Sequence, residues 1–457
     1  MVTVYWEQTT TAIRRLSMNE ELKRAHNTPL LHIDTAAGWR IYDEVDDARR
    51  DGYEVTIGDT FDKAYDHPGK ISQVHAFLHE HDMQLEQDRK QVIAQGLGRL
   101  GLNPLKRDYR REKAIDAALE PLRVQRLFGP NRAVAWHEQR GRAAALLSIV
   151  SAHDMQVDQD PTTGQYATMS GPLDARVLDY TFGQNAPRLA GVNIEQALIN
   201  AEKQYSGHTE ARAKQRASKR LQKMEEFVLS SVSPVFKDVI QYSADALGIR
   251  SRKAEVHQAI RHHLVDTLHA AGGREYLMMS FGCGTALPML EVIQDLKNHY
   301  DVHGRLILLD QDPLALASAA CLAKDMGVGD AIEIHCERLF GKFGGPIKLQ
   351  SILRGRQLDI AEDSGLREYL PDAIYRSLTR ETWRNLRSGG LMTTGNMNSN
   401  RPHAEFLHGM MGWWPKVQMR TIAEGARLHR EAGIPRQATR MRVTRDGVYT
   451  MYFTDKQ

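Results

Sequence analysis

The segment YLMMSFGCGTALPMLEVI, residues 276–293, decides how the C-terminal part of this chain folds. Its first six residues are apolar or small with no polar alternation, which is typical of a strand buried on both faces of a parallel sheet. Gly282, Cys283 and Gly284 follow as a glycine turn, and a helical pattern comes next. Such a turn lets the backbone approach a ligand closely, and the helix N-terminus offers unpaired N–H groups.

Strand and helix patterns alternate through the rest of this region. The expected strands are residues 276–281, 305–310, 331–336, 357–361 and 391–396, with a final pair at 439–444 and 449–454. Helical patterns separate them at 251–271, 287–300, 313–326 and 373–386. This alternation predicts an α/β fold, a Rossmann-like seven-stranded mostly parallel sheet with an antiparallel C-terminal hairpin.

The N-terminal part is expected to be mainly helical. Helical spacing occurs at residues 71–97, 113–149 and 194–229, and two weak strand patterns occur at 30–33 and 53–57. Residues 158–187 are rich in Gly, Pro, Thr, Asp and Asn, which indicates a long loop. We therefore divide the chain into a mainly helical region, residues 1–245, and a sheet domain, residues 246–457.

The composition excludes several classes of protein. The chain has 457 residues, of which 42% are hydrophobic and 26% charged, as in ordinary soluble domains. The net charge of +3 is too small to predict a nucleic-acid partner. No stretch is apolar enough for a secretory signal or a membrane span. The 3 cysteines lack CxxC spacing, which argues against a disulfide framework or a zinc site and favours a cytoplasmic location.

The next strand ends in an acidic residue. RLILLD, residues 305–310, places Asp310 at the strand end, about 25 residues after the glycine turn. A carboxylate in this position accepts hydrogen bonds from ribose hydroxyls in Rossmann-type sites. Asp312 has a simpler interpretation, because it precedes Pro313 as a helix cap. We assign Asp310 to ribose, with a buried structural acid as the alternative. A plain tight turn is the alternative for the glycines.

In this order, the motifs SFGCGT, LILLDQDP, LDIAEDSGLREYLPD and LRSGGLMTTGNM resemble those of class I S-adenosylmethionine-dependent methyltransferases. The resemblance covers residues 251–455, with Ser388 where proline is usual and Ala286 where many members have a third glycine. It implies S-adenosyl-L-methionine as the cofactor. DSGLREYL and GNMNSNRPHAEF are also similar to a bacterial group of hydroxy-fatty-acid methyl ester synthases, which implies a carboxylate acceptor. A dinucleotide fingerprint would instead require glycine at Leu287.

Candidate site residues follow from the strand ends, where ligands bind in such sheets. The expected cofactor-binding residues are Ser280, Phe281, Gly282, Cys283, Gly284, Asp310, Gln311, Glu337, Arg338, Glu362, Asp363 and Ser364. The catalytic candidates are His403, as a base, and Tyr369, with a structural or surface role as the alternative for His403. Asp359 is either beside the crevice or a structural acid, and Trp413 and Trp414 form either an acceptor wall or core.

The expected activity is methyl transfer to a small-molecule or lipid-like acceptor. An activated sulfonium needs no protein nucleophile and no metal, so catalysis consists mainly of alignment and exclusion of water. Residues 1–245 would supply an acceptor pocket, a lid or the interface of a homo-oligomer. Two alternatives stay open. One is aminocarboxypropyl transfer, as in nicotianamine-synthase-like proteins, and the other is a cofactor-binding scaffold without catalysis.

Overall fold

The structure is a computed structural model of the 457-residue chain. It describes residues 36–58, 68–94, 157–159, 166–168, 199–200, 202–204, 206–228, 242–266, 275–284, 286–300, 302–311, 313–340, 349–404 and 417–457. The helix expected at 113–149, the strand expected at 30–33, most of the loop expected at 158–187, Asp312, Trp413 and Trp414 lie outside these residues. Within the described ranges, no helix is both long enough and apolar enough to cross a membrane.

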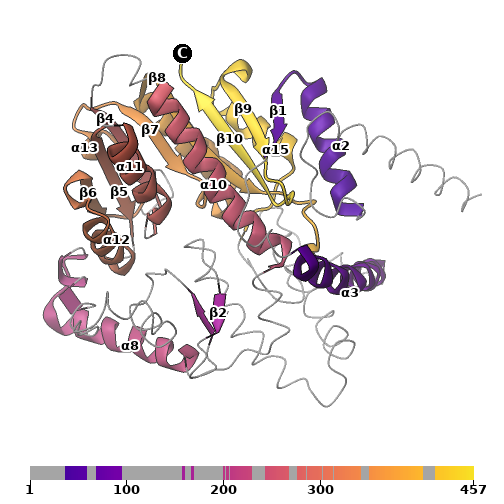
Figure 1. Ribbon diagram of the computed structural model, residues 1–457, viewed down its shortest axis with the longest axis horizontal. Coiled ribbons are helices and arrows are strands. Elements are labelled where there is room, and N and C mark those ends of the chain that lie inside the picture. Colours follow the sequence, from indigo (N-terminus) through magenta and orange to yellow (C-terminus); the bar gives the residue numbers. More distant parts are fainter. Residues whose placement is uncertain are drawn as a thin grey trace, which may run out of the picture.

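A mixed sheet lies at the centre of the described residues (Figure 1). Its eight described strands, in spatial order, are β1 (Glu54–Ile57), β9 (Thr439–Val443), β10 (Tyr449–Asp455), β8 (Leu386–Met397), β7 (Leu358–Asp363), β4 (Tyr276–Phe281), β5 (Gly304–Asp310) and β6 (Ile332–Cys336). β10 runs antiparallel to both neighbours, and the other pairs are parallel. The order reverses between β4 and β7. The expected Rossmann-like sheet with an antiparallel C-terminal hairpin is confirmed.

The sheet has one strand more than the seven expected. β1 comes from the N-terminal region and pairs in parallel with β9, with Glu54 opposite Arg440 and Ile57 opposite Val443. Only Val55 and Ile57 of this strand are buried, so its apolar signal is two residues long. A pattern this short does not reveal its partner, and the seven-strand count is therefore wrong by one edge strand. The domain boundary at residue 245 stays a prediction.

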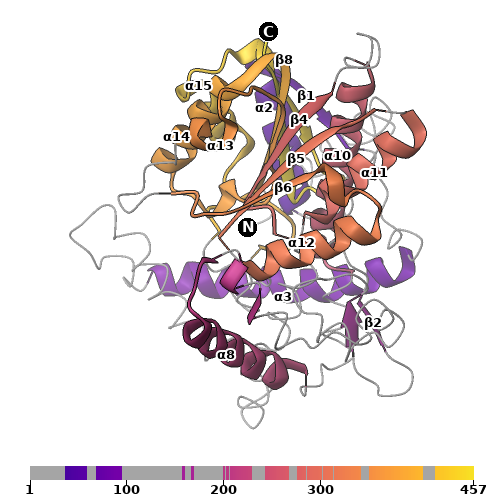
Figure 2. The same cartoon turned by 90° about the vertical axis from the view of Figure 1, so that its left-hand side faces the viewer.

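Helices cover both faces of the sheet (Figure 2). On one face lie α10 (Ala244–Leu264), α11 (Leu287–Tyr300) and α12 (Pro313–Asp325), and on the other α13 (Leu349–Leu353), α14 (Asp372–Asn385) and α15 (Ile422–Glu431). α2 (Ala36–Arg50) packs on α15 and β1 through Ile41, Tyr42 and Val45. Because helices exclude water from both faces, the central strands are apolar along nearly their whole length.

Helix boundaries differ from expectation where a cap or a glycine decides them. α10 begins at Ala244 rather than at 251, because the Ser243 hydroxyl accepts a hydrogen bond from the Ala246 N–H (3.4 Å). α8 (Glu210–Val228) is shorter than the expected 194–229, and Gly207, with φ 62°, precedes it in non-helical backbone. α3 (Pro68–Ala94) follows the predicted helix at 71–97 closely.

Parts of the N-terminal region lie beyond the carboxyl ends of the parallel strands. α3 and α8 are on that side of the sheet in both views (Figures 1 and 2). Two contacts agree with this placement. A ring nitrogen of His75 in α3 lies 3.2 Å from one of His403, which follows β8, and Ser206 Oγ lies 3.8 Å from Sγ of Cys336 at the end of β6. The N-terminal region therefore borders the edge where ligands bind in such sheets.

A buried ion pair fixes the segment that follows β7. Asp363, the last residue of β7, accepts hydrogen bonds from Arg367 Nε (2.8 Å) and Nη2 (2.6 Å), and both side chains are buried. Burial raises the pKa of the Asp363 carboxyl, and the Arg367 charge opposes that rise. Arg367 also donates to the backbone carbonyl of Tyr375 (3.2 Å). This pair holds the short 3-10 turn η7 (Arg367–Tyr369) against the end of the sheet.

We predict that Arg367→Met lowers the free energy of unfolding by about 3–5 kcal/mol, because it leaves the Asp363 carboxylate buried without its cation. Urea denaturation of the full-length protein measures this. The matched control is Arg376→Met, which removes a solvent-exposed ion pair with Glu431 and should cost much less stability than Arg367→Met. Equal losses in the two variants would contradict the structural role of the buried pair.

Candidate functional site

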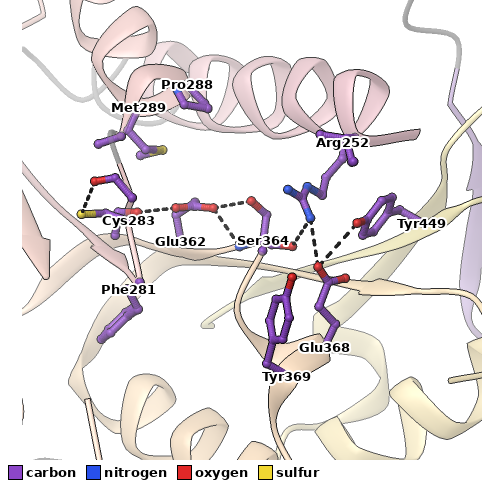
Figure 3. Close-up of a pocket in the computed structure, with 16 residues that line it drawn as sticks. Arg252, Phe281, Cys283, Pro288, Met289, Glu362, Ser364, Glu368, Tyr369 and Tyr449 are labelled. Atoms are coloured by element: carbon purple, nitrogen blue, oxygen red, sulfur yellow. Dashed lines mark hydrogen bonds and ion pairs between the residues drawn. The ribbon is translucent and has the colours of Figure 1, made fainter. Parts of the chain in front are cut away.

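A cavity of about 270 Å³ opens at the carboxyl ends of β4 and β7 (Figure 3). This is the point where the strand order of the sheet reverses, the usual ligand position in open parallel sheets. Its described lining residues come from α10, the end of β4, the glycine turn, the start of α11, the end of β7, the segment after it and the start of β10. The volume is slightly below the range of about 300–1,000 Å³ that is typical of small-molecule sites.

The glycine turn forms one wall of the cavity. Gly282 (φ 58°) and Gly284 (φ 55°) both adopt the left-handed conformation that favours glycine. A Cβ added to Gly284 would meet no atom within 4 Å, so this side of the turn is open. The Gly284 N–H donates to Asp310 Oδ2 at 2.9 Å. The turn therefore holds the Asp310 carboxylate beside the cavity.

Glu362 lies between the glycine turn and the segment after β7. It is 8% exposed, and it pairs across the sheet with Ser280 of β4. Its Oε2 accepts a hydrogen bond from the Ser280 hydroxyl, and its Oε1 accepts hydrogen bonds from the backbone N–H (2.8 Å) and the hydroxyl of Ser364. These donors stabilise a carboxylate at the edge of the cavity.

Arg252, Glu368 and Tyr449 form a second polar group at the cavity (Figure 3). Arg252 Nη1 donates to Glu368 Oε1 (3.4 Å) and to the Ser364 carbonyl (3.3 Å), and the guanidinium lies 4.6 Å from the centre of the Tyr449 ring. Burial raises the pKa of Glu368, and the Arg252 charge opposes this. Tyr369 stands beside this group and is 42% exposed.

The structure brings most of the predicted site residues together. Eight of them line the cavity: Ser280, Phe281, Gly282, Cys283, Gly284, Glu362, Ser364 and Tyr369. Asp310 lies beside the cavity through its hydrogen bond to Gly284. Gln311, Glu337 and Arg338 are exposed at the ends of β5 and β6 and are not among the lining residues. Asp363 is also away from the lining, in its ion pair with Arg367.

His403 is not among the described residues that line the cavity. Its backbone is left-handed (φ 58°), and its buried ring packs edge-on against His75 of α3, with ring centres 4.9 Å apart. A role for His403 as a catalytic base stays a prediction. Its position away from the cavity lining does not favour that role. Asp359 has a structural role, because it accepts a hydrogen bond from the Leu277 N–H (2.8 Å) and forms an ion pair with Arg387.

Sequence reasoning did not assign Arg252, Glu368 and Tyr449 to the site. Arg252 lies within an ordinary helical run, and Tyr449 begins the last strand. Only Glu368 gave a usable signal, because it follows a strand end in the same motif as Tyr369. The other two reach the cavity through tertiary packing of α10 and β10, which contact each other.

No protein-family model and no curated protein matches this chain. Among solved structures, a possible exported protein from Bordetella parapertussis has a TM-score of 0.39 at 18% identity and covers 59% of this chain and 96% of its own. An O-methyltransferase family protein from Burkholderia thailandensis has a TM-score of 0.35 at 15% identity, covering 78% and 99%. Magnesium protoporphyrin IX methyltransferase from Synechocystis PCC 6803, with bound SAM, has 0.33 at 10% identity, covering 47% and 84%. Likeness this weak carries no argument for function.

We predict that the Cys283 thiol reacts slowly in the folded protein. Burial raises its pKa, and the neighbouring Asp310 and Glu362 carboxylates raise it further. At pH 8, alkylation of Cys283 by iodoacetamide should be roughly tenfold or more slower than in the urea-unfolded chain, because the thiolate is the reactive form. Mass spectrometry of the peptide that contains Cys283 measures both rates. Equal rates would contradict the described environment of this thiol.

Proposed function

We propose that this protein is an S-adenosylmethionine-dependent methyltransferase that acts on a small-molecule acceptor. The observation that carries this proposal is the glycine turn, which faces the cavity and holds the Asp310 carboxylate through the Gly284 N–H. The position at the reversal of strand order supports it, because nucleotide-like ligands bind there in open parallel sheets. The ordered sequence motifs are consistent with this interpretation.

The residues around the cavity fit this cofactor. Gly284 leaves room for close approach of a ligand to the backbone, and Asp310 offers a carboxylate for the ribose hydroxyls. Glu362 provides a largely buried carboxylate beside the turn, suited to a cationic ligand group. When bound, the cofactor supplies an activated methyl group on a sulfonium.

The protein residues then mainly bind and orient the reactants. Phe281 and Met289 give the cavity apolar walls that exclude water, which strengthens the electrostatic interactions inside it. The N-terminal residues near the carboxyl ends of the strands are in position to form an acceptor pocket or a lid. A homo-oligomer interface is the third role that we propose for residues 1–245.

We predict that Asp310→Ala weakens binding of S-adenosylhomocysteine by about 10- to 100-fold, the loss typical of hydrogen bonds to a charged group. Isothermal titration calorimetry of the full-length protein measures the dissociation constant. Asp330→Ala is the matched control, because Asp330 is exposed in the turn that leads into β6, at the end of the strands opposite to Asp310. Unchanged binding in Asp310→Ala would show that Asp310 does not hold the ribose.

Product analysis separates the proposed reaction from its alternatives. Methyl transfer releases S-adenosylhomocysteine, whereas aminocarboxypropyl transfer releases methylthioadenosine. We expect S-adenosylhomocysteine when the protein turns over S-adenosylmethionine with a competent acceptor, measured by liquid chromatography and mass spectrometry. Methylthioadenosine as the main product would support the nicotianamine-synthase-like alternative. Tight cofactor binding with neither product would support a scaffold without catalysis.

A further inference from the structure

The side chains at one end of the cavity indicate which kind of acceptor it would take. This inference rests on the proposed methyltransferase function. Figure 3 shows the Glu368 carboxylate, the Arg252 guanidinium and the Tyr369 ring grouped at one end, with Cys283 and Met289 at the other. The glycine-turn end is the part that we assign to the cofactor. The end beside Glu368 and Arg252 is therefore where the acceptor would meet it.

Carboxylates outnumber cations among the described residues that line this cavity. Glu362 and Glu368, 8% and 2% exposed, accompany a single guanidinium, that of Arg252. This cation is already engaged, because it bonds to Glu368 Oε1 (3.4 Å) and to the Ser364 carbonyl (3.3 Å). A further anion in this space would add negative charge near the two carboxylates. Among the described lining residues, only the Arg252 guanidinium would balance this charge.

Three of the four hydroxyls among the described lining residues are also engaged, and the fourth is that of Tyr369. The hydroxyls of Ser280 and Ser364 both donate to Glu362, and the Tyr449 hydroxyl donates to Glu368 Oε1 at 3.5 Å. Among the described lining hydroxyls, a carboxylate acceptor that entered here would find only that of Tyr369 as a donor for two charged oxygens that lose their hydration, which is costly. A hydroxyl or an amine, by contrast, has hydrogen atoms to offer to these carboxylates.

We propose that the acceptor is a hydroxyl or an amine, a nucleophile that carries a proton, and that Glu368 accepts this proton while Arg252 holds the Glu368 carboxylate in place. The X–H bond of the acceptor breaks and its proton moves to Glu368. The bond from X to the methyl carbon forms as the methyl–sulfur bond breaks, and the electron pair of that bond stays on sulfur as a neutral thioether. Burial raises the pKa of Glu368, which makes it a better proton acceptor than a free glutamate.

This proposal replaces the carboxylate acceptor that the sequence resemblance implied. A carboxylate is already deprotonated and would have no use for Glu368 as a base. A hydroxyl or an amine gives the buried Glu368–Arg252 pair a chemical role at the cavity. Tyr369, which is 42% exposed next to the pair, is the side chain placed to contact the body of the acceptor.

Binding of three matched probes to the unmodified protein gives the first test. Benzyl alcohol, benzylamine and benzoate share one ring and differ in the polar group, and each is titrated by calorimetry into full-length protein saturated with S-adenosylhomocysteine. We expect the alcohol or the amine to bind roughly tenfold or more tightly than benzoate, because like charges repel in a desolvated site. Tighter binding of benzoate, or no binding of either the alcohol or the amine, would overturn the proposal.

The variant Glu368→Gln then assigns the preference to one residue, because it removes the charge and keeps the shape. We expect the preference against benzoate to shrink about tenfold, since one repelling charge is gone. Glu54→Gln, at an exposed position on β1, is the matched control and should leave the order of affinities unchanged. An unchanged preference against benzoate in Glu368→Gln would refute the role of Glu368. The probe series on the unmodified protein tests the acceptor class even if this variant does not fold.

Methyl transfer to the tightest probe tests the proton acceptor itself. We expect kcat of Glu368→Gln to fall by about 100-fold or more while KM changes little. In the unmodified protein, kcat should fall as the pH drops through the pKa of Glu368, at a higher pH than for a free glutamate, and the variant should lose this acidic limb. An unchanged kcat and pH profile, or a bound probe that is never methylated, would count against Glu368. Failure of the unmodified protein to bind S-adenosylhomocysteine would instead contradict the proposed function.

Discussion

The burial of both faces of the central strands is the constraint on which the rest of the structure depends. β4 is apolar along its length because helices lie on both of its sides, so polar chemistry is displaced to the ends of the strands. The reversal of strand order between β4 and β7 then separates the connections that leave these two strands. In that gap lie the glycine turn, Glu362 and Glu368, which are the groups that give the cavity its chemistry.

The fold and one wall of the site were predictable because their signals are local. The run of apolar residues in β4, the glycines after it and the acid at the end of β5 lie within 35 positions, 276–310, of one another. Each obeys a rule about strands, turns or strand ends that needs no knowledge of distant contacts. The short strand β1 escaped the count because four residues, of which two are buried, carry too little pattern to identify a partner.

The other wall of the cavity was not predictable because it is made by distant contacts. Arg252 meets Ser364 and Glu368, which are 112 and 116 residues away along the chain, only because α10 lies across the sheet. His403 is the opposite case, a residue that the sequence placed in the site and the structure places elsewhere. Its position after β8 suggested a place in the site, yet its left-handed backbone accompanies a ring that contacts His75 instead. Residue type and position after a strand do not determine which way a side chain faces.

The pairing of β1 with β9 has a consequence for the order in which the chain folds. Thr56 of β1 and Arg442 of β9, which form a hydrogen bond, are 386 residues apart, so β1 emerges from the ribosome long before its partner strand exists. α2 can pack on Val55 and Ile57 early, but their cluster with Met441 and Val443 is complete only after the last strands of the sheet have been synthesised. Because closure of so large a loop costs conformational entropy, we expect this edge to form late in folding, after the glycine turn and its neighbouring strands.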